Sequence, residues 1–122
     1  MLQPRSIVSI ADNTGAKIGR VFKVTGSSKK RYAEIGEVVI ISVQKAEPRK
    51  TVKKKDIHRA VVVRQKKAFR RADGSYVRFD ENAVVLIDKT KGEPIGGRVF
   101  GPIPRELALK YQKIVSLASE VV

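Results

Sequence analysis

The apolar residues of this chain come in short, β-branched runs separated by turn residues, and this pattern limits the fold more than any other feature. The runs lie at residues 7–11, 20–25, 38–43, 57–63, 76–79 and 83–87. Runs of this length and composition favour strands over helices. We therefore predict a mainly β fold. Closing these strands into a small β-barrel would bury their apolar faces and remove exposed sheet edges.

The pattern inside the runs predicts which strand faces are buried. Residues 20–25 alternate, so one face should be buried while Arg20 stays in water. Residues 38–43 and 57–63 contain consecutive apolar residues, which are typical of strands covered on both sides or of barrel strands. Asp73 and Gly74 are suited to a hairpin turn between flanking strands.

Apolar residues recur at helical spacing near the end of the chain, behind Pro104, a residue tolerated in a first helical turn. These positions are Leu107, Tyr111, Ile114 or Val115, and Ala118. A length of 122 residues fits one compact domain. We predict a β-barrel over about residues 1–100 and a C-terminal segment with short helices over about residues 101–122.

The chain is strongly basic, with 26 Lys and Arg against 12 Asp and Glu, a net charge of +14 and a pI near 10.4. Because 42% of the residues are hydrophobic, this charge should lie on a folded surface, where it indicates a polyanionic partner such as nucleic acid. Residues 45–71 hold twelve basic and two acidic residues. They form two bunches, 49–55 and 64–71, at opposite ends of the strand predicted at 57–63, roughly 20–25 Å apart.

This separation favours a scaffold that touches several nucleic-acid segments over one that grips a single short ligand. Lysines neutralise phosphates, and arginines can also bind them bidentately or stack on bases. Including a third bunch before Tyr32, the candidate RNA-binding residues are Lys29, Lys30, Arg31, Arg49, Lys50, Lys53, Lys54, Lys55, Arg64, Lys66, Lys67, Arg70, Arg71 and Arg78. The alternative for any one bunch is ordinary solvated charge. The nearby aromatic residues are Tyr32, Phe69 and Tyr76. We interpret them first as packing residues and only second as platforms on which RNA bases stack.

Catalysis has little support in the sequence. The chain has no cysteine, and its one histidine, His58, lies in a predicted strand without a second histidine to share a metal. Asp80 and Glu81 adjoin each other along the chain and so do not converge as an acid/base pair. No apolar run approaches the ~20 residues that span a bilayer. We expect no enzyme activity, no cofactor or metal, no membrane partner, and a cytoplasmic location.

Residues 60–86 carry a specific resemblance. Ala60 and three valines are followed, after nine residues, by Asp73-Gly74, then after four by Phe79, after two by Asn82, and after two by Val85-Leu86. This segment resembles the universal ribosomal protein fourteen family of the large subunit. Further segments similar to bacterial members lie at 11–16, 31–33, 52–54, 100–102, 105–107 and 113–118, so the resemblance covers essentially the whole chain.

The resemblance implies a five-stranded β-barrel followed by a part with short helices. It also implies binding to large-subunit (23S) rRNA, a bridge to small-subunit (16S) rRNA, and packing beside ribosomal protein nineteen. The resemblance further implies that a ribosome-silencing factor docks, in bacteria and organelles, on the face that meets the small subunit. By analogy, the candidates for this partner or bridge surface are Arg98, Arg105, Lys113 and Ser116. An ordinary helix surface is the alternative for them.

Three positions depart from the bacterial pattern: Lys55 replaces Gly, Gly97 replaces Thr, and Ser119 replaces Pro. The side chain of Lys55 adds charge and restricts the backbone conformations open to its loop.

Two other function classes compete with the ribosomal one. A free-standing nucleic-acid-binding regulator would not travel with ribosomal subunits, and a nucleic-acid-modifying enzyme would need a catalytic constellation that His58 alone does not supply.

Overall fold

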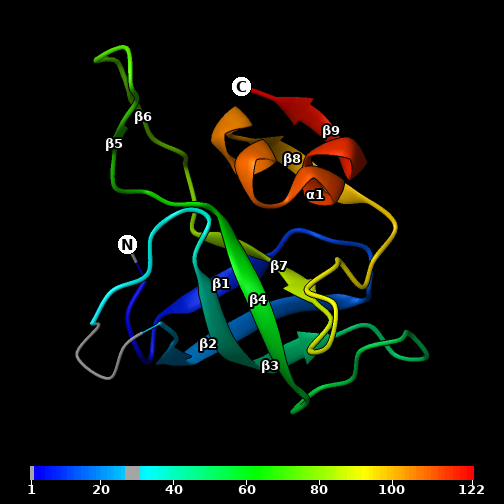
Figure 1. Ribbon diagram of the computed structural model, residues 1–122. Coiled ribbons are helices and arrows are strands. Elements are labelled where there is room, and N and C mark those ends of the chain that lie inside the picture. Colours follow the sequence, from blue (N-terminus) through cyan, green and yellow to red (C-terminus); the bar gives the residue numbers. More distant parts are fainter. Residues whose placement is uncertain (1, 27–30) are drawn as a thin grey trace.

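The computed structural model describes residues 2–26 and 31–122, and its centre is a closed β-barrel (Figure 1). The barrel strands are β1 (Ile7–Ile10), β2 (Ala16–Val24), β3 (Val38–Ala46), β4 (Ile57–Arg64) and β7 (Ala83–Ile87). Their order is β1-β2-β3-β4-β7, with antiparallel neighbours except for the parallel β1–β7 pair that closes the barrel. The mainly β fold and the five-stranded barrel are therefore confirmed.

The barrel interior is filled by aliphatic side chains at alternate strand positions. Val21, Ile41, Ala60 and Leu86 are fully buried there, each on a different strand. Gly19 lies on β2 where a side chain would meet Ile41, since a Cβ at this position would lie 2.8 Å from Ile41 Cδ1. A small interior of this kind is filled by side chains and leaves no channel.

Strands β4 and β7 are covered on both sides. Val62 and Val84 face the barrel interior, whereas Val61 and Val85 belong to a second apolar cluster outside it. The burial on both sides predicted for residues 57–63 is confirmed over the second half of β4, from Ala60 to Arg64, whereas Ile57–Arg59 stays exposed or half-buried. For residues 38–43 the barrel alternative holds, because β3 is a barrel strand whose residues alternate between buried and half-buried.

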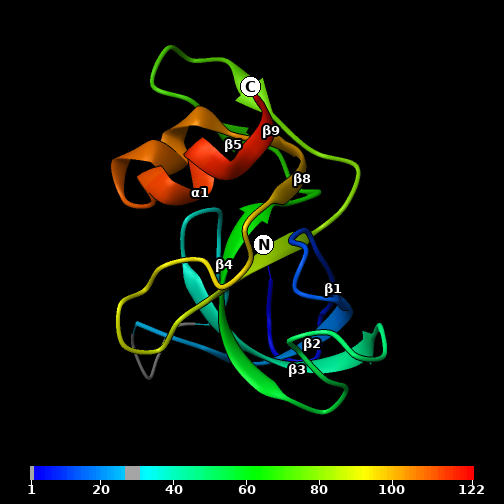
Figure 2. The ribbon, with the colours of Figure 1, turned by 90° about the vertical axis from the view of Figure 1, so that its right-hand side faces the viewer.

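The second cluster is completed by the C-terminal segment, which packs on the outside of β4 and β7 (Figure 2). This segment contains β8 (Val99–Ile103), the 3-10 helix η1 (Arg105–Leu109), α1 (Gln112–Leu117) and β9 (Ala118–Val121). Ile103, Leu107 and Ile114 are almost fully buried in it. Burial of each such side chain stabilises the fold by about 1.5–3 kcal/mol, so the segment is firmly docked.

The short C-terminal helices are confirmed, but two details of the prediction are wrong. Ala118 begins β9, which pairs in parallel with β8 through Val99 and Ala118, so it does not continue the helix. Pro104 has extended backbone angles and precedes η1 instead of lying in its first turn. Pairing with a strand from an earlier part of the chain overrides the local helical periodicity here.

A two-stranded hairpin, β5 (Phe69–Arg70) and β6 (Tyr76–Val77), projects from the barrel (Figure 1). The predicted Asp73-Gly74 turn joins its strands, with Gly74 at φ +91° and Asp73 Oδ1 accepting hydrogen bonds from the amide and hydroxyl of Ser75. The run at 76–79 thus supplies a hairpin strand and not a barrel strand. Arg71 ties the hairpin to the C-terminal segment, through Glu106 at 2.9 Å and the backbone oxygen of Val122 at 2.7 Å.

Candidate nucleic-acid interface

The loop between β3 and β4 presents the first basic bunch to solvent. Val52 anchors this loop: its side chain is buried in the barrel core, and its amide donates to the Thr14 carbonyl at 3.3 Å. The basic side chains around it are all exposed: Arg49, Lys50, Lys53, Lys54 and Lys55. The loop is therefore held by one apolar residue while its cations remain available to a partner.

Lys55 adopts the backbone conformation of the glycine that it replaces. Its φ is +74°, and its amide donates to the Val43 carbonyl at 2.8 Å. The turn is closed by the Asp56 amide, which donates to the Lys53 carbonyl at 3.2 Å, and by the Asp56 carboxylate, which accepts from the Lys53 amide at 3.0 Å. A residue that carries a Cβ is strained at this φ, and the surrounding hydrogen bonds hold it there.

The basic side chains of the second bunch and of Arg78 differ in their exposure to solvent. Lys66, Lys67, Arg70 and Arg78 are exposed at and near the hairpin. By contrast, Arg71 is held by the contacts with Glu106 and Val122 described above. This half of the candidate surface therefore presents fewer cations than the sequence count indicates.

Arg64 is the member of the second bunch that the structure takes into the protein interior. Its side chain is 7% exposed, and Nη2 lies 2.9 Å from Glu81 Oε1. Its Nη1 donates to the carbonyl oxygens of Phe100 at 2.8 Å and Pro102 at 3.0 Å. These contacts join the end of β4 to β8. An RNA contact by Arg64 stays a prediction.

The two bunches lie at opposite ends of β4, as the sequence predicts (Figure 1). In the third bunch Arg31 is exposed, and Lys29 and Lys30 lie outside the described residues. Tyr32 and Tyr76, interpreted from the sequence as packing residues, are 47% and 69% exposed. Exposed aromatic rings beside cations are what base stacking on RNA requires.

A further set of basic residues, missed as site candidates, lies on the outer face of the barrel. Arg20 pairs with Ser42 across β2 and β3, while Lys23 and Arg59 flank Ile40 in the next row across β2, β3 and β4. All three basic side chains are exposed. The alternation of strand residues places them outward, so the sequence contained the signal, but their scatter along the chain hides the shared face.

Three of the four candidates for the partner surface lie on α1 or beside the β8–β9 pairing that follows it. Lys113 and Ser116 are exposed on α1, where Ser116 Oγ donates to the Lys113 carbonyl at 2.7 Å. Lys113 also pairs with Glu93 at 3.1 Å. Arg98 precedes β8 next to the residue that pairs with Ala118, at the end of α1. Arg105 lies beyond the other end of β8 and is separate from them.

The one histidine of the chain, the possible metal ligands and the helices bear on whether the protein is a catalytic or membrane protein. His58 lies in β4, as predicted, with Nε2 3.7 Å from Asp56 Oδ2. In the part of the chain that the structure describes, no group of three His, Cys, Asp or Glu side chains could hold a metal ion. Nor does any helix in that part have the length and apolar character to cross a membrane.

A comparison with protein families shows to which family the chain belongs. The family model for ribosomal protein L14p/L23e matches residues 1–122, the full chain. The chain belongs to the L14p/L23e family. Members of this family are structural proteins of the large ribosomal subunit, so the chain is a ribosomal, ribonucleoprotein component of translation and not a member of an enzyme family.

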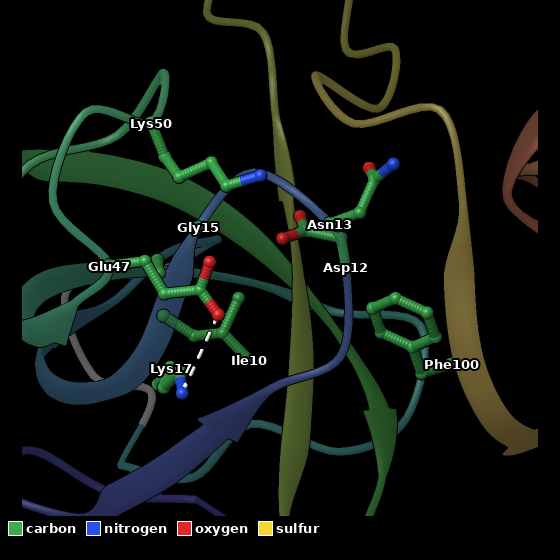
Figure 3. A pocket seen from close by; sticks show the side chains of 9 residues that line it. Ile10, Asp12, Asn13, Gly15, Lys17, Glu47, Lys50 and Phe100 are labelled. Atoms are coloured by element: carbon green, nitrogen blue, oxygen red, sulfur yellow. Dashed lines mark ion pairs between the residues drawn. The ribbon is translucent and has the colours of Figure 1, made fainter.

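Two segments that resemble this L14p/L23e family, 11–16 and 100–102, meet beside the barrel (Figure 3). The Phe100 amide donates to the Ala11 carbonyl at 2.6 Å, and the Gly97 amide donates to Asn13 Oδ1 at 2.9 Å. Gly97, a departure from the bacterial pattern, thus contributes a backbone contact, and no atom lies within 4 Å of where its Cβ would be. The other departure, Ser119, is an exposed residue of β9.

Asp12 is the buried polar residue of this junction. Its Oδ1 accepts from the Thr14 hydroxyl at 2.6 Å and the Thr14 amide at 3.3 Å, and its Oδ2 accepts from the Leu86 amide at 3.0 Å. Burial raises the pKa of this carboxyl above its ordinary value, and the hydrogen bonds from Thr14 and Leu86 oppose that rise. Asp12 therefore connects β7 to the turn that leads into β2.

Proposed function

We propose that this chain binds large-subunit rRNA and contributes to an intersubunit bridge with small-subunit rRNA. The observation that carries the proposal is the placement of exposed cations at both ends of β4, on a loop anchored by Val52 and on the β5–β6 hairpin. Rigid loops present their charges without a large ordering cost, so phosphate contacts at both ends would fix the relative position of two RNA segments.

The experiment is to measure affinity for a large-subunit rRNA fragment as salt is raised. Each neutralised phosphate contributes about −0.9 to the slope of log affinity against log salt, so several contacts give a steep negative slope. Replacing Lys53, Lys54 and Lys55 by Gln should weaken binding and flatten the slope by about 2–3 while stability changes little. A flat salt response of the unmodified protein would refute the mechanism.

We further propose that the surface of Arg98, Lys113 and Ser116 receives a protein partner. Packing beside ribosomal protein nineteen and docking of a ribosome-silencing factor are the candidate interactions. Lys113 and Ser116 are exposed on α1, and Arg98 precedes the strand that pairs with the residue after α1, which supports one shared surface. Charge reversal of Arg98 and Lys113 to Glu should abolish capture of the silencing factor. Arg105→Glu is the matched control, since Arg105 lies elsewhere.

Sedimentation separates this role from that of a free-standing nucleic-acid-binding regulator. A constitutive component travels with the large subunits in a gradient, whereas a regulator remains in the free-protein fractions. Residues 1–122 are proposed to act as one domain in this assembly, because the barrel and the C-terminal segment share the second apolar cluster.

A further inference from the structure

A cavity lies between the β1–β2 connection, the β3–β4 loop and β8, and it shares Lys50 with the basic surface described above (Figure 3). Its volume is about 360 Å³, within the range of small-molecule sites. Ile10 and Phe100 supply apolar lining, while Lys17, Glu47 and Lys50 supply charged groups. Phe100 comes from β8, so the C-terminal segment supplies one wall of the cavity.

The Phe100 ring is available to a ligand. Its side chain is 47% exposed at the edge of the cavity, and the backbone of the same residue is fixed by the hydrogen bond to Ala11. Figure 3 shows the ring on the opposite side of the cavity from Glu47 and Lys17. An aromatic face held in a fixed position and open to solvent is a platform on which a flat ring can stack.

Lys50 is held over the cavity by its neighbour Gly15. Gly15 has φ +100°, and a Cβ there would lie 2.2 Å from Lys50 Cβ, so the lysine stem rests on the glycine backbone. Figure 3 shows the Lys50 side chain extending across the cavity towards Asp12. Across from it, Lys17 Nζ lies 3.5 Å from Glu47 Oε1. The cavity thus offers ammonium donors and a carboxylate acceptor around an aromatic wall.

These groups together identify the chemistry of the occupant. Two ammonium groups offset by the carboxylates of Glu47 and Asp12 do not make a polyphosphate cradle. A carboxylate can accept from base or ribose donors, a lysine can bind a single phosphate or a base acceptor, and the aromatic wall suits a π-face. A purely apolar side chain would satisfy only the aromatic wall.

We propose that this cavity binds one unpaired RNA nucleotide, with its base stacked on Phe100 and Glu47 and Lys50 contacting its polar edges and phosphate. The proposal rests on the RNA-binding function proposed above and adds a specific subsite to it. The basic loops hold the RNA backbone without regard to pairing, whereas the cavity selects a nucleotide that lies outside a helix.

The test compares RNA hairpins with and without one bulged nucleotide, by fluorescence anisotropy with the full chain. Four bulged hairpins carry A, C, G or U, and the fully paired hairpin is the reference. The unmodified protein should bind at least one bulged hairpin about tenfold more tightly than the reference, and Phe100→Leu should abolish this preference. Phe22→Leu is the matched control, because Phe22 is equally exposed at 47% but lies on β2 away from the cavity.

The outcomes separate the two proposals. Equal binding of all hairpins, or a preference that survives Phe100→Leu, overturns the nucleotide site and leaves the rRNA-binding function standing. Failure to bind any hairpin overturns both. Adenosine, cytidine, guanosine and uridine 5′-monophosphates are titrated separately, and affinity for any of them equal to that for the bulged RNA would assign the cavity to a free nucleotide instead. Thermal unfolding of Phe100→Leu must match that of Phe22→Leu, and a selective loss of folding would make Phe100 structural.

Discussion

At the scale of single residues, backbone conformation and burial decide properties that the residue type alone does not. Lys55 is a charged surface residue, yet its backbone has the positive φ that favours glycine. Asp12 is an acid, yet it is 5% exposed and bonded inside the protein. Both residues lead to measurable consequences for folding.

Lys55→Gly should stabilise the protein, because glycine adopts positive φ without the strain of a Cβ. We expect the free energy of unfolding to rise by about 0.5–1 kcal/mol after allowance for the greater freedom of glycine in the unfolded chain. Urea denaturation measures this change. Lys54→Gly removes the same charge from the same turn at a residue without positive φ, and should lower stability. A Lys55→Gly protein no more stable than Lys54→Gly would contradict the strain argument.

Asp12 should titrate above its unfolded value of 3.8, because burial raises its pKa. An acid whose pKa is raised in the folded state binds its proton more tightly there. Its ionisation therefore weakens folding as pH rises from the unfolded pKa through the folded one, and the native state is favoured by this group only at lower pH. Carboxyl ¹³C NMR titration measures the midpoint directly.

Asp73 provides the internal control for this titration. It is exposed in the hairpin turn, and hydrogen bonds from the Ser75 hydroxyl and amide lower its pKa. The two aspartates should therefore titrate in the order Asp73 before Asp12 as pH is raised. The reverse order would mean that the carboxyl of Asp12 is solvated in solution.

At the scale of elements, β4 is the strand on which the rest of the molecule is assembled. Its inward side chains complete the barrel, its outward valines support the C-terminal segment, and its two ends carry the basic loop and the hairpin. Arg64 completes this role at the last residue of the strand, where its guanidinium bonds to the carbonyl oxygens of Phe100 and Pro102.

Arg64→Gln should destabilise the fold, because it leaves the two carbonyl oxygens of β8 without their charged donor. We expect a loss of about 2–4 kcal/mol in the free energy of unfolding, measured by urea denaturation. Arg78→Gln is the control, since Arg78 is exposed nearby and should change stability by less than about 0.5 kcal/mol. An Arg64→Gln protein that folds normally but binds RNA poorly would support Arg64 as an RNA contact and contradict this stabilising role.

At the scale of the whole molecule, the cations of the described residues lie on several separate elements. The loop at 49–55 and the hairpin occupy opposite ends of β4, while Arg20 and Lys23 of β2 and Arg59 of β4 lie on the outer face of the barrel. A small protein with this distribution can contact RNA on several sides at once, which fits a member of a structural ribosomal family.

Substitutions at the two ends of β4 should therefore affect different RNA segments. Lys53→Gln with Lys54→Gln should remove hydroxyl-radical protection from one segment of a bound rRNA fragment, and Arg70→Gln with Arg78→Gln from another. Each pair should reduce the salt slope by about 2, and the four substitutions together by about 4. Loss of the same protected nucleotides in both pairs would indicate a single contiguous contact.

The local sequence pattern was sufficient to predict most of the strands and the position of the basic residues along the chain. The β-branched runs, the Asp73-Gly74 turn and the basic bunches are properties of neighbouring residues, and most of the runs became strands of the barrel. Strand periodicity and turn chemistry act over a few residues, so they can be interpreted without knowledge of the fold. The family likeness of the sequence extended this to the five-stranded barrel and to the ribosome.

Contacts between distant parts of the chain were decided only by the tertiary structure. They include the pairing of Ala118 with Val99, the enclosure of Arg64 by β8, and the approach of Phe100 to the turn after β1. Local sequence assigned Ala118 to a helix, and it did not indicate the intramolecular partners of Arg64, because it contains the side chain but not its partner. The free energy of each contact depends on which groups the folded chain brings together and removes from water, and no local pattern encodes that arrangement.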